Sequence, residues 1–178
     1  MTYTMTKRIA MLLAIIALLL PAVCAIAEYT VLPPLRITEV MASNKSTLKD
    51  AFGKYSDWIE IHNEGSEPVL LDGVALSDKN GKLDKYLFRQ GIHIQPDEYI
   101  IVFASGLIKE FEDEYHASFK LSKNGEAVFL SIGGHVIDSV VFGVQETDVS
   151  LALDEDGVYK STTTPTPGGP NIISPNMR

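Results

Sequence analysis

Trp58, Glu60 and His62 alternate along the stretch YSDWIEIHNEG, which holds the only tryptophan of the chain. A period of two places these side chains on one face of a β-strand and the two intervening isoleucines on the other. An exposed tryptophan beside a carboxylate could bind the flat face of a sugar. We favour a structural role, because large aromatic side chains are usually packed. Trp58 is therefore expected to pack under the loop that begins near Asn44.

Two acidic clusters could hold a metal ion. Calcium takes six to eight oxygen ligands at fixed offsets, and neither cluster supplies them. The clusters are SDKNGKLD, with Asp78, Asn80 and Asp84, and LDEDG, with Asp154, Glu155 and Asp156. The histidines lack the paired spacing that is typical of zinc sites; they are His62, His93, His116 and His135. We predict no metal site and no cofactor.

Residue patterns for catalysis are also missing. The sequence has no Gly-x-Ser-x-Gly nucleophile elbow and no glycine-rich phosphate loop. The acidic run KEFEDEY reads as a solvated face rather than the facing carboxylates of a glycosidase. We therefore predict no catalytic residue and no enzymatic activity. The short polar residues Asn44, Asp57 and Asn63 are expected to bond nearby backbone amides at the ends of the strand.

Short strands with frequent turns account for most of the remaining chain. Alternating or fully apolar runs occur around residues 35–43, 57–63 and 99–103, and three more strands are predicted within 117–143. Turns are expected at four pairs: Asp72-Gly73, Asn80-Gly81, Asn124-Gly125 and Gly133-Gly134. Residues 44–56 read as a long loop. Only residues 106–117 have spacing that a helical turn or two would fit. This pattern predicts an all-β sandwich or barrel.

The N-terminus has the three-part organisation of a secretory signal peptide. A basic start at Lys7 and Arg8 precedes an apolar run and a small-residue ending, so cleavage is expected between Ala27 and Glu28. Two alternatives stay open, an uncleaved membrane anchor and a lipidated Cys24. The apolar run is short for a span, and Val23 directly before the cysteine fits a lipoprotein poorly.

Charge and cysteine content limit the possible partners. Removing 27 of the 178 residues leaves 151, enough for one domain, and changes the net charge from −8 to −10. Nucleic acid is not expected as a partner, because phosphate binding needs clustered lysine and arginine, and only Lys79, Lys82 and Lys85 gather near a hairpin. Cleavage would also remove the only cysteine, which excludes disulfides.

Several pieces in order carry a family resemblance. They are ITEVMASN, DWIEIHN, LLDGVALSD, PDEYIIVFASG, ASFKLSKNGEAVFL, DSVVFG and TPTPGGPN. Together they resemble the bacterial lamin tail domain, which implies an immunoglobulin-like β-sandwich. The resemblance marks structural motif residues, namely Asn44, Asp57, Trp58, Glu60, Asn63, Gly73, Ser77, Asp78, Pro167, Gly168 and Asn171. One departure is Leu153, which stands where the family commonly has arginine.

The expected organisation is a signal peptide over residues 1–27, a linker over 28–34, the sandwich over 35–171 and a tail over 172–178. The fold alone implies no chemistry. We expect a secreted or cell-surface module that binds an unidentified protein or a cell-envelope component through a sheet face, an edge strand or the 44–56 loop. Family association offers an alternative, an accessory domain or subunit beside a secreted hydrolase or a spore-coat kinase. DNA or calcium binding is a further, weaker hypothesis.

Overall fold

The computed structural model describes residues 32–107 and 114–173, and these residues form strands and loops without a helix. The signal-peptide cleavage site at Ala27 and Glu28, and Cys24, lie outside the described residues. Because the described part contains no helix, it offers no helical segment long and apolar enough to cross a membrane. The strands are β1 (Leu35–Met41), β2 (Trp58–Asn63), β3 (Val69–Leu70), β4 (Val74–Ser77), β5 (Tyr86–Leu87), β6 (His93–Ile94), β7 (Tyr99–Phe103), β8 (Tyr115–His116), β9 (Glu126–Ile132), β10 (His135–Phe142), β11 (Ser150–Leu153) and β12 (Tyr159–Thr162).

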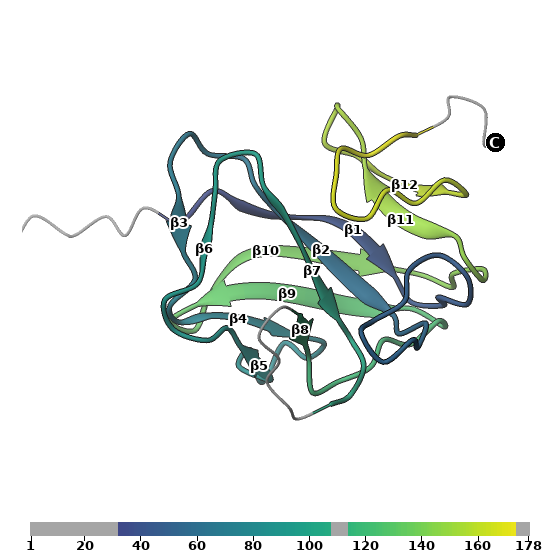
Figure 1. Ribbon diagram of the computed structural model, residues 1–178, viewed down its shortest axis with the longest axis horizontal. Helices are drawn as coiled ribbons and strands as arrows, with labels where there is room; N and C mark the ends of the chain where they lie inside the picture. The colour runs from purple at the N-terminus through teal and green to yellow at the C-terminus, as the bar shows by residue number, and fades with distance from the viewer. Residues whose placement is uncertain (1–31, 108–113, 174–178) are drawn as a thin grey trace, which may run out of the picture. The chain divides into compact units, whose positions relative to one another are not determined.

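The strands form two main sheets and a small ribbon (Figure 1). The larger sheet has the order β12-β11-β1-β2-β7-β8, the second has the order β10-β9-β4-β5, and β3 pairs with β6. Every pairing is antiparallel except that between β7 and β8. Buried aliphatic side chains of both main sheets share one core, among them Ile37, Ile61, Leu76 and Leu130. The all-β class is confirmed, and the arrangement is consistent with an immunoglobulin-like sandwich.

The hydrophobic pattern fixes the register of the larger sheet. Ile59 and Ile61 of β2 pack into the shared core, and Ile100 and Val102 of the neighbouring β7 do the same. β7 lies between β2 and β8, a central position that fits the apolar residues on both of its faces. A register shift between β1 and β2, around Thr38, brings two charged residues directly opposite one another.

The turn predictions succeed unevenly. Gly133 and Gly134, both with positive φ, form the two-residue turn between β9 and β10. Asn80 and Gly81 lie within a longer connection between β4 and β5, so that hairpin is not a two-residue one. Gly125 has a φ of +101°, and a Cβ there would lie 2.7 Å from the carbonyl oxygen of Phe142. The chain therefore turns there before β9, where only glycine fits.

Between residues 106 and 123 one expectation is wrong and another is restricted to fewer residues. Tyr115 and His116 form strand β8, parallel to β7, so a helix does not continue to residue 117; residues 108–113 lie outside the described part. The strand expected at 117–123 is also absent. The backbone N–H of Gly106 donates to the carbonyl oxygens of both Ala117 and Phe119 at 3.0 Å, which bends the segment away from a regular ladder. Phe119 and Leu121 still enter the core.

The proline- and threonine-rich segment 163–173 lies against the larger sheet. Before it, β12 pairs with β11, and β11 pairs with β1. Asn171 then donates from Nδ2 to the carbonyl oxygens of Thr38 at 2.9 Å and Leu153 at 3.0 Å. This segment is called the capping segment below. Its contacts decide the environment of the acidic residues on β1 and β2.

Candidate functional site

The side chain of Trp58 is fully buried. It packs in a small cluster with Met41 of β1 and Phe103 of β7, and Leu48 of the 44–56 loop covers the cluster. The cluster lies apart from the shared core, on the opposite face of β2 from Ile59 and Ile61. Trp58 has no exposed ring face to offer a sugar, so its position fits a role in holding the loop to the sheet.

Glu60, two residues further along β2, is also fully buried and lies directly opposite Glu39 of β1. The hydroxyl of Thr38 donates to Oε1 of Glu60 at 2.7 Å, and the backbone N–H of Gly168 donates to Oε2 at 2.7 Å. The capping segment thus closes over the glutamate. Glu60 has donors on both carboxyl oxygens and no opening to solvent.

Glu39 has a similar environment. The hydroxyl of Ser150 donates to its Oε1, and the backbone N–H of Thr166 donates to Oε2 at 3.1 Å. Burial raises the pKa of Glu39. Burial also raises the pKa of Glu60, which reaches about 7 because the nearby Glu39 carboxyl adds to the effect and the hydrogen bonds offset only part of it. The two carboxyls are part of the packed interior.

The polar residues at the ends of β2 hold loops in place. Asp57 Oδ1 accepts the backbone N–H of Asn44 at 3.0 Å. Asn44 donates from Nδ2 to the carbonyl oxygens of Leu48 at 2.7 Å and Ser56 at 2.8 Å, which ties both ends of the 44–56 loop together. Asn63 accepts from Gly65 and donates to the Glu67 and Ile94 carbonyls.

The other residues that the sequence singled out lie in or next to turns, in the capping segment and, for His62, on β2 itself. Gly73 has a φ of +78° in the turn before β4. The hydroxyl of Ser77 donates to the carbonyl oxygen of Lys82 at 2.5 Å and accepts from the N–H of Lys79. Asp78 pairs with Lys85, with an N–O distance of 2.5 Å. Pro167 directly precedes Gly168 in the capping segment. His62 stacks on Tyr99, and burial lowers its pKa.

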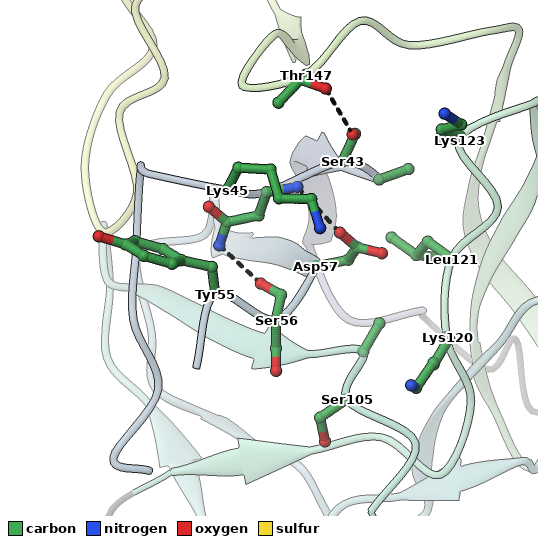
Figure 2. Close-up of a pocket in the computed structure, with 13 residues that line it drawn as sticks. Ser43, Lys45, Tyr55, Ser56, Asp57, Ser105, Lys120, Leu121, Lys123 and Thr147 are labelled. Atoms are coloured by element: carbon green, nitrogen blue, oxygen red, sulfur yellow. Dashed lines mark hydrogen bonds between the residues drawn. The ribbon is translucent and has the colours of Figure 1, made fainter. Parts of the chain in front are cut away.

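An open pocket of about 490 Å³ lies where β1 and β7 end and β2 begins (Figure 2). The residues that line it come from five segments of the chain. They are Ala42, Ser43, Asn44, Lys45, Tyr55, Ser56, Asp57, Ala104, Ser105, Lys120, Leu121, Lys123 and Thr147. Its volume falls in the range of about 300–1,000 Å³ that is usual for small-ligand sites, although its walls are more polar than most.

Three lysines and one carboxyl dominate the charge of the pocket. Figure 2 shows Lys45 extending over Asp57 on one side, with Lys120 and Lys123 on the facing wall. Burial raises the pKa of Asp57, while the nearby ammonium groups of Lys45 and Lys120 act in the opposite direction. Among the described residues, none of the three lysines has a carboxylate within ion-pair distance. Lys45 and Lys120 act on Asp57 only beyond ion-pair distance.

The segment 145–148 fixes the wall formed by the 44–56 loop. Gln145 accepts the N–H of Ala42 at 2.7 Å and donates to the carbonyl oxygen of Val40. Asp148 accepts the N–H groups of Lys45 at 2.7 Å and Ser46 at 2.9 Å. The backbone that carries Lys45 is therefore held by a carboxylate from a distant part of the chain, and hydrogen bonding lowers the pKa of that carboxyl.

A serine, a histidine and a glutamate form a chain of hydrogen bonds beside the pocket. Ser105 Oγ lies 3.0 Å from Nδ1 of His116, and Nε2 of His116 lies 3.0 Å from Oε2 of Glu114. A serine hydrolase presents Nε2 to the nucleophile, so the ring is reversed here. Ser105 Oγ also accepts the N–H of Leu107, and Glu114 accepts the N–H of Ala51 at 2.8 Å. These bonds join loops across the molecule.

The acidic clusters do not gather ligands for a metal. Asp154 accepts the backbone N–H groups of Asp156 and Val158 and pairs with Lys160. In the part of the chain that the structure describes, no three histidine, cysteine or acidic side chains lie close enough together to hold a metal ion.

The described residues form an all-β domain in which the motif residues hold loops and turns in place. A sequence model of the Lamin Tail Domain family matches residues 30–143, which is more than half of the chain. The chain belongs to the lamin tail domain family. No curated protein matches it. The matched range ends before β11 and β12, although both strands continue the larger sheet of this lamin tail domain.

Sequence reasoning missed most of the pocket. Asn44 and Asp57 were identified as motif residues, but the three lysines, Ser105 and Thr147 were not. No sequence signal joins them, because they come from segments that only the sheet topology brings together. Glu39 did carry a signal, since an acid within the apolar run LRITEVM is unusual for a buried strand.

Proposed function

We propose that this lamin tail domain is a secreted, non-catalytic binding module that holds a protein or a cell-envelope component in the pocket beside the 44–56 loop. One observation carries the proposal. The pocket gathers three lysines that have no carboxylate within ion-pair distance among the described residues, whereas both oxygens of the buried Glu60 carboxyl accept hydrogen bonds from the fold. The family is an interaction module with an immunoglobulin-like fold, which supports the same view.

The test is co-sedimentation with envelope fragments from the organism that makes the protein, at low and at physiological salt. Thr147→Trp places a large neutral ring at the exposed rim of the pocket, and Thr163→Trp places the same ring at an exposed position outside it. We expect sedimentation that survives salt, that falls at least tenfold with Thr147→Trp and that is unchanged with Thr163→Trp. A protein that stays in the supernatant would favour the accessory role beside a secreted enzyme.

Secretion and the absence of catalysis have their own tests. Mass spectrometry of the protein recovered from culture medium should show an N-terminus at Glu28. A mass that retains residues 1–27, or a lipid on Cys24, would contradict secretion in the proposed form. A panel of hydrolase substrates and a fluorophosphonate probe should give no turnover and no label at Ser105. Turnover that disappears when one carboxylate is removed would show an enzyme.

DNA is a poor candidate partner. The net charge of −8 repels polyanions, and Lys85, one of three lysines near the β4–β5 connection, is paired with Asp78.

A further inference from the structure

The cations in the pocket suggest the chemistry of its ligand. A lysine ammonium that faces an open pocket gains most from an anion with hydrogen-bond acceptors. Lys45 and Lys120 already act electrostatically on the carboxyl of Asp57, so both are close enough to act on a second oxyanion in the same space. Lys123 adds a third positive charge from the same wall as Lys120.

Hydroxyl groups provide further donors. Ser43 and Thr147 lie together on one side of the pocket and share one hydrogen bond of 3.2 Å. A pair of hydroxyls has two hydrogens, and one bond between them uses one, so one hydrogen is left to donate to a ligand. The apolar lining consists of Ala42, Ala104, Leu121 and the ring of Tyr55. A polar ligand fits these walls better than an apolar one.

Overall charge limits the size of the anion. The chain carries a net charge of −8, so a long polyanion that ran over the surface would be repelled outside the pocket. A single acidic group inside the pocket meets three lysines against one carboxyl. The favourable field is therefore local, and it selects a small ligand or the terminal unit of a larger molecule.

We propose that this pocket binds a small polar ligand that carries one oxyanion, a carboxylate or a phosphate, with Lys45, Lys120 and Lys123 as its cationic contacts. The inference rests on the proposed function and names the ligand chemistry of the same site. The ligand is either free in solution or the terminal acidic unit of an envelope glycan.

The experiment is an NMR titration of the protein with D-glucuronate, D-glucose and inorganic phosphate. Glucuronate should give saturable shifts at the amides of Ser105, Lys120 and Lys123, phosphate should shift the same signals, and glucose should shift none. Equal binding of glucose would overturn the proposal. Two polyanions, polygalacturonate and poly-L-glutamate, test the restriction to a single oxyanion. If either one bound more tightly than glucuronate at the same concentration of acid groups, that restriction would be overturned.

Charge variants locate the binding. The double variant Lys45→Gln/Lys120→Gln should weaken glucuronate binding at least tenfold. The control is Lys82→Gln, the same substitution at an exposed position outside the pocket, which should change glucuronate binding less than twofold. Asp57→Asn should tighten binding several-fold, because it removes the one negative charge of the pocket and keeps an acceptor for Asn44. Unchanged affinity in the double variant would contradict the assignment.

Sedimentation with envelope fragments distinguishes the tethering function from the oxyanion site, and a free ligand from the terminal unit of an envelope glycan. Glucuronate that releases the protein from envelope fragments supports a glycan terminal unit. Glucuronate binding without any envelope binding supports a free ligand and contradicts only the tethering function. Envelope binding that is lost with Thr147→Trp but kept in the double lysine variant would overturn the oxyanion proposal and leave the binding module standing.

Discussion

Glu60 and Asp57 lie three residues apart on the chain, and the fold uses them in opposite ways. Glu60 faces Glu39 and is closed off by the capping segment, with backbone and hydroxyl donors on its oxygens. Asp57 has one backbone donor and borders a pocket with three lysines. In the first region, both oxygens of each glutamate accept hydrogen bonds from the fold. In the second, the three lysines have no carboxylate within ion-pair distance among the described residues.

This difference separates scaffolding from a binding site better than burial or residue type does. Both regions contain carboxyls whose pKa is raised by burial, so a shifted pKa alone would point to either. What differs is the opposing charge. No lysine or arginine contributes to the shift of Glu60 or Glu39, whereas Lys45 and Lys120 both act on Asp57. Variants along β2 can test this contrast directly.

Trp58 lies between the two regions, and its removal should have the largest effect. Trp58→Ala would empty a fully buried site beneath the loop, and large-to-small changes of this kind cost about 3–5 kcal/mol. We expect a corresponding loss in the free energy of unfolding, measured by chemical denaturation. The 44–56 loop should also lose order, because Leu48 packs on this cluster.

Trp58→Phe provides the matched control, since it keeps an aromatic ring and should lose less stability. If Trp58→Ala unfolded at the same denaturant concentration as the natural protein, the ring would have to be exposed. The separation of the two regions by a packed cluster would then be wrong.

The buried glutamate pair should make the stability of the protein depend on pH. The pKa of Glu60 is raised from 4.5 to about 7, so between these values the folded protein holds a proton that the unfolded chain releases. The free energy of unfolding should therefore fall as pH rises from about 4.5 to about 7, by about 3 kcal/mol if Glu60 acted alone. Glu39, whose pKa is also raised, acts in the same direction.

Glu60→Gln isolates this contribution. The amide oxygen can accept from Gly168, and the amide nitrogen can donate to Thr38, whose hydroxyl can turn to accept. The variant should be more stable than the natural protein at pH 8, with the gain disappearing toward pH 4.5. The lowered pKa of His62 makes the protein lose stability as pH falls. This contribution is the same in both proteins, so it cancels in the difference between their free energies of unfolding. A constant difference at all pH values would contradict the assignment.

The sequence pattern predicted which face of β2 each side chain occupies, because that depends only on neighbouring residues in the chain. Alternation placed Ile59 and Ile61 in the core and Trp58 and Glu60 on the other face, as the structure has them. The pairing of Glu39 with Glu60 depends on the register between strands, which the bulge near Thr38 sets and no local pattern reveals. The prolines of the capping segment lack the N–H that a ladder needs, so no strand pattern predicts that the N–H groups of Thr166 and Gly168 bond the two glutamates.

The capping segment should contribute a smaller amount through Asn171. Its Nδ2 donates to the carbonyl oxygens of Thr38 and Leu153, and its Oδ1 accepts from the hydroxyl of Thr166. Asn171→Ala removes these bonds and should cost about 1–3 kcal/mol, because it leaves acceptors without donors. Thermal unfolding measures the loss. Asn80→Ala, at an exposed turn, is the control and should change stability by no more than about 0.5 kcal/mol.

The pocket lysines should contribute least to stability, which is the other half of the contrast. Lys45, Lys120 and Lys123 are exposed and have no ion-pair partner among the described residues. Changing Lys120 to glutamine should alter the free energy of unfolding by no more than about 0.5 kcal/mol, as for other surface positions. A loss of 2 kcal/mol or more would mean that the fold depends on this charge. The pocket would then be scaffolding like the glutamate pair. An unchanged stability with weakened glucuronate binding would separate the two regions by function, because it would show side chains that the ligand needs and the fold does not.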